Sequence, residues 1–136
     1  MSSQVEVVSA ERHVPPDAAP VISTEIENGV LIVRFNTPEV KDIGYARRVS
    51  SDLKKLAIAI GGNMLLSLDN VEFLSSVGVA TIVSFNRVLR TAGGRLVICR
   101  MRPVIRGLFS ASGLDEVMEI YDTKAAALWA FRSTVS

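Results

Sequence analysis

The sequence predicts a single α/β domain, in which about four helices pack on a mixed but mostly parallel β-sheet. Short apolar runs of strand length alternate along the chain with longer segments whose apolar residues recur every three or four positions. Such alternation is typical of parallel strands joined by helical crossovers. A length of 136 residues and a hydrophobic content of 49% suit one domain with a full core.

The first two strands are expected at residues 21–26 and 30–35. Between them lies Asn28-Gly29, which is a strong signal for a tight hairpin turn. Pro38 follows the second strand, and proline cannot donate a hydrogen bond to a strand ladder. An N-terminal β-hairpin is therefore predicted, and its antiparallel pair makes the sheet mixed.

A first amphipathic helix is predicted from residue 42 to residue 60, because the spacing of apolar residues changes there to three and four. The Gly61-Gly62 pair ends it. Residues 64–68 then form a short buried strand. The apolar stripe of the helix consists of Ile43, Ala46, Val49, Leu53, Leu56, Ala57 and Ile60.

The second half of the chain repeats this alternation. A helix is predicted at residues 76–91, a strand at 95–99, a third helix opening at Pro103, and a last strand at 117–121. Thr123 can cap a final helix, in which Trp129 is expected to be partly buried against the sheet.

The chain ends are predicted to lie outside the domain. Residues 1–20 contain three prolines and no apolar periodicity, so we expect a flexible leader, followed by the domain at 21–132 and a tail at 133–136. No secretory signal is visible, and no apolar run approaches the roughly 20 residues that span a bilayer. A cytoplasmic protein without membrane insertion is expected.

Composition argues against an enzyme and against a resident cofactor or metal. The single cysteine, Cys99, lies in an apolar run and is expected to be buried, and the single histidine, His13, lies in the leader. One cysteine and one histidine make no zinc site, and a serine nucleophile would lack a nearby base. The Gly-x-Ser-x-Gly motif is absent.

The net charge of +1 gives no overall attraction to nucleic acid, and direct nucleic-acid binding is not expected. The charges are nevertheless uneven along the chain. A solvated basic face is the first explanation, an acidic protein partner or nucleotide phosphates the second, and DNA the third. Between residues 73 and 114 there is no acidic residue but there are six arginines: Arg87, Arg90, Arg95, Arg100, Arg102 and Arg106.

The most informative segment is residues 65–80, which reads as a buried strand, a polar Asp69-Asn70 turn, and two serines before an apolar helix. Ser76 has two interpretations. Its hydroxyl can cap the free N–H groups of the helix, or it can carry a phosphate, which the same N–H groups and the helix dipole favour.

The order of strand, Asp69, Phe73, serine turn and Gly78 resembles the STAS family. The resemblance continues in the turn and strand of residues 92–99 and in residues 102–109 and 112–114, and it covers roughly residues 21–132. This family includes bacterial anti-sigma factor antagonists and the cytoplasmic ends of sulfate transporters.

The resemblance implies a phosphoacceptor at Ser76, within the family pattern Asp-Ser-Ser/Thr-Gly. Here Ser75 stands in place of the aspartate, which makes it a competing acceptor. Val77 replaces the second hydroxyl residue, and Gly78 matches. The implied partner-binding residues are Asp69, Phe73, Ser75, Ser76, Val77 and Gly78.

The implied function is that of an anti-sigma factor antagonist. The unphosphorylated domain would bind a serine-kinase-type anti-sigma factor and release the sigma factor, and a serine phosphatase would reverse phosphorylation. The kinase uses ATP and Mg²⁺, whereas the antagonist needs no cofactor. The alternative is a constitutive scaffold or accessory subunit of a signalling assembly or membrane transporter. The oligomeric state stays open.

Overall fold

The computed structural model describes residues 22–36 and 43–132, so the predicted leader and tail lie outside the described residues. Five strands form one sheet in the order β1-β2-β3-β4-β5. β1 pairs antiparallel with β2, and the three other pairs are parallel, which confirms the predicted mixed sheet with an N-terminal hairpin. The strands are β1 (Ile22–Glu27), β2 (Val30–Phe35), β3 (Asn63–Ser67), β4 (Arg95–Cys99) and β5 (Glu119–Tyr121).

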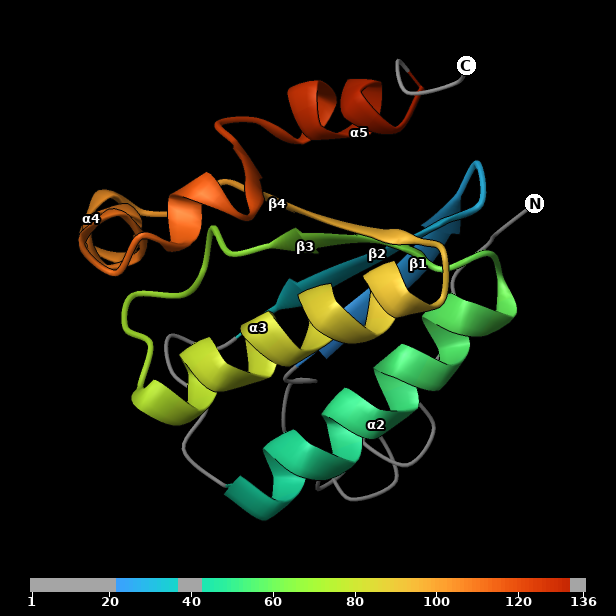
Figure 1. Ribbon diagram of the computed structural model, residues 1–136, viewed down its shortest axis with the longest axis horizontal. Helices are drawn as coiled ribbons and strands as arrows, with labels where there is room; N and C mark the ends of the chain where they lie inside the picture. Colours follow the sequence, from blue (N-terminus) through green and yellow to red (C-terminus); the bar gives the residue numbers. More distant parts are fainter. Residues whose placement is uncertain (1–21, 37–42, 133–136) are drawn as a thin grey trace.

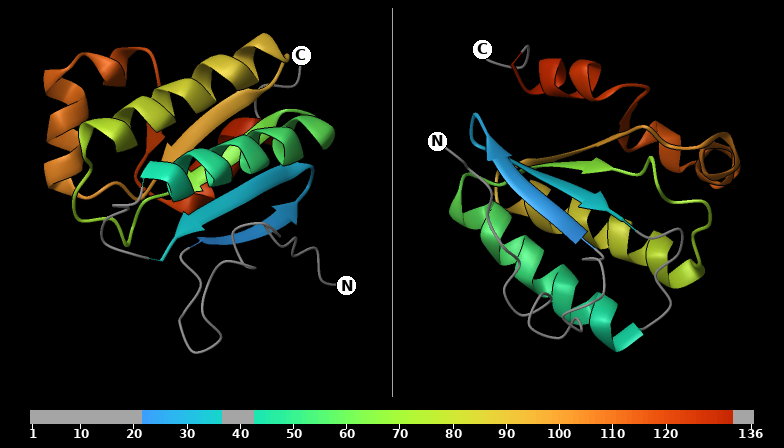
Figure 2. Two further views of the ribbon diagram at one scale, coloured as in Figure 1. Left: turned by 90° about the horizontal axis from the view of Figure 1, so that it is seen from below. Right: turned by 180° about the vertical axis from the view of Figure 1, so that it is seen from behind.

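Helices cover both faces of the sheet (Figure 1). Two long helices, α2 (Ile43–Ala59) and α3 (Ser76–Thr91), pack side by side on one face, and α5 (Lys124–Arg132) lies on the other. α4 (Pro103–Ala111) and the short 3₁₀ helix η1 (Leu114–Glu116) lie beyond the carboxyl end of β4, as the two views of Figure 2 also show. Within the described ranges, no helix is long and apolar enough to cross a membrane.

The hairpin turn forms as its sequence predicts. Asn28 and Gly29 have φ angles of 54° and 79°, in the left-handed region that a tight turn of this kind requires at both positions. Asparagine and glycine reach this region at lower cost than other residues.

Two apolar layers sandwich the sheet. The larger layer lies under α2 and α3, where Leu53, Phe85 and Leu89 are almost fully buried. The smaller one joins Leu65 and Val97 of the opposite face to Ala127 of α5, and it contains Cys99, whose predicted burial is confirmed. Burial on both faces is the usual environment of parallel strands.

The turns before β3 and β4 come into backbone contact at the amino ends of these strands. The N–H group of Arg95 donates a hydrogen bond of 2.9 Å to the carbonyl oxygen of Gly62. A Cβ atom added at Gly94 would lie 1.8 Å from the same oxygen. Glycine is therefore required at position 94 by close backbone approach.

One prediction about the last helix is wrong. The Trp129 side chain is 62% exposed, whereas partial burial against the sheet was expected. The residues of α5 that face the sheet are Ala127 and Ala130, one turn apart, and their small size lets the helix pack closely. Trp129 projects from a different side of α5, and the Arg132 guanidinium lies 5.7 Å from its ring centre.

The last strand is also shorter than predicted. β5 begins at Glu119, because residues 114–116 form η1 and Met118 donates its N–H group to the carbonyl oxygen of Leu114. The chain reaches the sheet edge only after this turn.

Candidate functional site

The start of α3 is capped by Ser75, which corrects the interpretation of Ser76 as the N-cap. Ser75 has extended backbone angles (φ −74°, ψ 170°), and its Oγ accepts a hydrogen bond of 3.2 Å from the N–H group of Gly78. An N-cap residue has this backbone conformation, and its side chain accepts from the second or third helical N–H group. Ser76 is consequently the first residue of the helix.

Ser76 is exposed and lies where negative charge is favoured. The first N–H groups of an α-helix have no acceptor within the helix, and the dipole places partial positive charge there. The first turn of α3 contains no acidic residue, so a phosphate on Ser76 would meet no carboxylate within that turn. The side chain of Ser75 is partly buried by comparison.

Beside this helix start lies an exposed aromatic ring. Phe73 is 55% exposed. Leu74 does pack against the larger core. Both residues line a small apolar hollow of about 40 Å³, together with Phe35, Val71, Ser75, Val77, Gly78, Thr81 and Ile82. Four of the predicted partner-binding residues therefore line one hollow: Phe73, Ser75, Val77 and Gly78.

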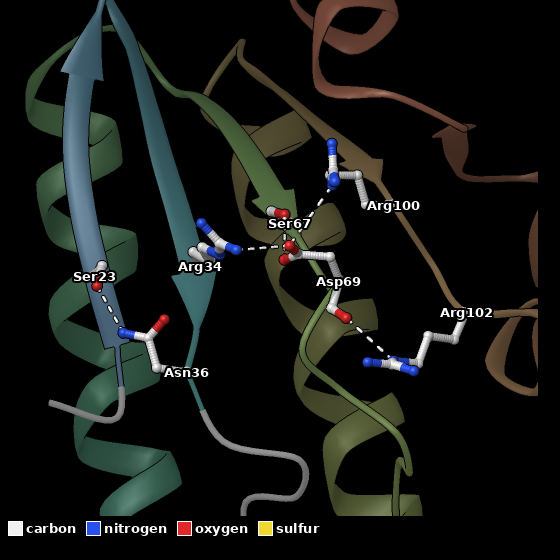
Figure 3. A network of polar contacts seen from close by, with 7 residues as sticks. All are labelled: Ser23, Arg34, Asn36, Ser67, Asp69, Arg100 and Arg102. Carbon is white, nitrogen blue, oxygen red and sulfur yellow. Dashed lines mark hydrogen bonds and ion pairs between the residues drawn. The ribbon is translucent and has the colours of Figure 1, made fainter. Parts of the chain in front are cut away.

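Of the two predicted partner-binding residues outside this hollow, Ser76 lies at the helix start and Asp69 belongs to a separate polar network (Figure 3). Its carboxylate accepts hydrogen bonds of 2.7 Å from Arg34 Nη2 and 3.1 Å from Ser67 Oγ, and lies 3.6 Å from Arg100 Nε. The Asp69 carbonyl oxygen accepts a hydrogen bond of 3.1 Å from Arg102 Nε. The residue thus fixes the beginning of the loop that leads to Ser75.

The partners of Asp69 could have been found only from the register of the strands. Arg34 pairs with Ser67 across β2 and β3, and Ser67 pairs with Cys99 across β3 and β4. The carboxyl ends of parallel strands lie at one edge of the sheet, so residues there meet although they are far apart in sequence. No local motif predicts that meeting.

The arginine-rich segment is only in part the solvated face expected. Arg95 binds the Glu119 carboxylate through both Nε and Nη2, and this hydrogen bonding raises the pKa of Arg95. Arg106 Nη1 lies 3.2 Å from Asp122 Oδ1. The C-terminal acids therefore supply partners across the fold. Arg87 and Arg90 are exposed on α3, as predicted.

A polar groove of about 430 Å³ runs between α2 and α3 and reaches the start of α3 at Val77. In it, Lys54 Nζ donates a hydrogen bond of 2.6 Å to Ser84 Oγ. Burial lowers the pKa of Lys54, and the nearby Arg87 charge lowers it further. We call this the α2–α3 groove; its lining residues are Arg47, Ser50, Ser51, Lys54, Val77, Ala80, Thr81 and Ser84.

The described side chains include no cluster of three or more histidines, cysteines and carboxylates that could hold a metal ion. The geometry does provide an exposed hydroxyl at a helix start, an exposed aromatic ring beside it, and a cationic, hydroxyl-rich groove that reaches the first turn of the same helix. This combination suits binding of a protein.

Comparison with known proteins points in the same direction. The model of the STAS domain family matches residues 21–127. An anti-sigma F factor antagonist from Paenibacillus polymyxa is 31% identical over 113 residues, which cover 79% of this chain and 91% of that protein. A crystal structure of an anti-sigma factor antagonist from Mycobacterium paratuberculosis is 27% identical with a TM-score of 0.66, and the match covers 87% of this chain and 97% of that one.

The fold is also that of the Bacillus protein SpoIIAA, which has been solved in unphosphorylated and phosphorylated forms. The unphosphorylated form gives a TM-score of 0.67 and covers 85% of this chain and 99% of that chain. The phosphorylated form gives a TM-score of 0.62 and covers 82% and 99%. Sequence identity is 22% in both comparisons.

Proposed function

Because the chain belongs to the STAS domain family, we propose that it is an anti-sigma factor antagonist controlled by phosphorylation of Ser76. The unphosphorylated protein binds a serine-kinase-type anti-sigma factor, and the sigma factor is released. The related antagonist from Paenibacillus polymyxa supports the general role. The observation that carries the proposal is Ser76 itself, an exposed hydroxyl at the first position of α3 beside the exposed ring of Phe73.

The proposed docking surface consists of Phe73, Ser76 and the α2–α3 groove. Aromatic side chains are enriched in protein interfaces, and a ring that is 55% exposed has apolar area left to bury against a partner. The groove offers serine hydroxyls and the cations Arg47 and Lys54 to a polar or acidic segment of that partner. Arg87 and Arg90 extend the positive charge along α3.

Ser76 is preferred over Ser75 as the phosphoacceptor on structural grounds. The Oγ of Ser75 accepts the N–H group of Gly78 and is partly buried, whereas Ser76 is exposed. In the transfer, the Ser76 oxygen forms a bond to the γ-phosphorus of ATP, the bond to ADP breaks, and the hydroxyl proton is released. A serine phosphatase hydrolyses the ester and resets the switch.

Phosphorylation acts on docking rather than on folding. It adds about 1.5 to 2 negative charges to Ser76, at a helix terminus that tolerates them. A partner that covers Phe73 would have to desolvate these charges, and burying an unpaired charge is costly. The phosphorylated domain should therefore stay folded while it loses affinity.

The proposal is tested with purified serine-kinase-type anti-sigma factors of the source organism, by calorimetric titration of variants. We expect Ser76→Ala to bind as the parent does, and Ser76→Asp and Phe73→Ala to bind at least about tenfold more weakly, a loss of about 1.4 kcal/mol. The carboxylate of the first variant would be buried without a partner, and the second variant removes an aromatic anchor of the interface. The matched control is Val104→Ala on α4, a side chain that is 70% exposed but lies outside the docking surface. If Ser76→Asp and the kinase with ATP leave binding intact, the domain is a constitutive scaffold or accessory subunit.

A further inference from the structure

The second face of the sheet is only partly covered. The nine-residue helix α5 packs over Leu65 and Val97, and the carboxyl ends of β2, β3 and β4 extend beyond it. A hollow of about 440 Å³ lies there. Its volume falls within the range of small-molecule sites, and the carboxyl ends of the strands are where open α/β sheets usually bind ligands.

The register of the strands explains which side chains meet in the hollow. Ser23 pairs with Arg34 across β1 and β2, and Arg34 pairs with Ser67 across β2 and β3. Paired residues point to the same face, so these three side chains form a row across three strands (Figure 3). Arg100 and Lys124 also line the hollow, as does Asn36, whose amide donates a hydrogen bond of 2.7 Å to Ser23 Oγ.

The hollow carries an excess of positive charge. Lys124 Nζ lies 3.2 Å from Glu25 Oε2, which balances one cation. The single carboxylate of Asp69 is shared between Arg34 and Arg100, at 2.7 Å and 3.6 Å, so one of these two charges is not balanced within the hollow.

The two guanidinium groups also have donors to spare. Each carries five N–H groups. Towards described residues, Arg34 makes one hydrogen bond, to Asp69, and Arg100 contacts the same carboxylate as an ion pair. Their side chains are 50% and 49% exposed. Planar guanidinium groups in this arrangement suit bidentate binding of carboxylates and phosphates.

The backbone of Arg100 supports a binding role. Its φ angle is +60°, a conformation that non-glycine residues seldom adopt and that is concentrated at functional sites. Arg100 directly follows β4, and its side chain points towards Asp69 (Figure 3).

We propose that this hollow binds a small oxyanion, the carboxylate or phosphate group of a small molecule, through Arg34 and Arg100. The Ser23 hydroxyl, whose oxygen accepts from Asn36, can donate its own proton to the same group, whereas the Ser67 hydroxyl donates to Asp69. The site lies on the face of the sheet opposite to the α2–α3 groove, so it is independent of the docking surface. If the hollow binds no oxyanion, the proposed function is unaffected.

The test is a titration of the ¹⁵N-labelled protein followed by NMR, with inorganic phosphate in one arm and succinate in the other, at ionic strength held constant with sodium chloride. We expect saturable shifts of the amide signals of Ser23, Ser67 and Arg100 in at least one arm. Saturation by phosphate alone assigns a phosphate-bearing ligand, and saturation by succinate alone assigns a carboxylate. The absence of saturation in both arms overturns the proposal.

Variants separate a built site from general charge attraction. Arg34→Gln and Arg100→Gln should each raise the dissociation constant at least tenfold, whereas Arg90→Gln, an equal loss of charge at the far end of α3, should leave it unchanged. Arg100→Gly removes the cation and suits the left-handed backbone, so it remains informative if the glutamine variants do not fold. Equal weakening by Arg90→Gln, or unchanged binding by Arg100→Gly, contradicts the proposal.

Discussion

Replacing the two neighbouring serines one at a time should separate the structural role of Ser75 from the exposed position of Ser76. Ser75→Ala removes the hydrogen bond of 3.2 Å from the Gly78 N–H group to the cap oxygen. Loss of an N-cap side chain typically costs about 1 kcal/mol. The bond is longer than the usual 2.9–3.0 Å of N–H···O bonds, which argues for about 1 kcal/mol rather than for the upper end of that range. For a domain of this size, the melting temperature should fall by about 4 °C.

Ser76→Ala should behave differently, because the Ser76 side chain is exposed and the cap oxygen belongs to Ser75. The expected change is within about 0.5 kcal/mol. Ser75→Asp should retain or exceed the parent stability, since a carboxylate both caps the helix and complements its dipole by about 0.3–1 kcal/mol. Urea denaturation of the three variants measures these differences. A cost for Ser76→Ala equal to that for Ser75→Ala, or a destabilising Ser75→Asp, would refute the assignment of the cap.

Three further predictions concern the turn before β4, the cysteine and the basic surface. Gly94→Ala should lower the free energy of unfolding, measured by urea denaturation, by about 3 kcal/mol or more, because the added Cβ would collide with backbone. Gly107→Ala, whose Cβ would meet open space within α4, should raise it by about 0.5–1 kcal/mol. Equal effects of the two substitutions would contradict the close approach. Cys99 is fully buried and burial raises its thiol pKa, so a thiol reagent should label the native protein about 100-fold more slowly than the unfolded one. Labelling of the native protein as fast as the unfolded one would contradict this burial. The unfolded thiol ionises above about pH 8.5 while the folded thiol keeps its proton, so the contribution of Cys99 to the free energy of unfolding should fall as the pH rises beyond that value. Charge reversal at Arg87 and Arg90 should slow association with the anti-sigma factor in stopped-flow measurements at low salt, and less so at high salt; unchanged rates would mean that these side chains are only solvated.

The elements of the fold could be predicted because their signals are local. The bounds of α3 and β4 follow from apolar spacing and from glycine and proline positions, and Asn28-Gly29 specifies the hairpin turn by its own backbone preferences. These features do not depend on which other parts of the chain lie nearby.

The site could be predicted only in part, because its remaining features depend on tertiary contacts. The sequence identifies a serine turn before a helix, but backbone angles decide that Ser75 rather than Ser76 is the cap. The partners of Asp69 come from the ends of two other strands. Whether Trp129 is exposed depends on which side of α5 meets the sheet.

The most direct test of the proposed function is the affinity of one anti-sigma factor kinase for the domain before and after phosphorylation with that kinase, ATP and Mg²⁺. The phosphorylated residue is identified by mass spectrometry. We expect a single phosphate on Ser76, an unchanged fold by circular dichroism, and an affinity lowered at least about tenfold, which corresponds to about 1.4 kcal/mol. Phosphate on Ser75 alone, or undiminished binding after stoichiometric phosphorylation of Ser76, would contradict the account.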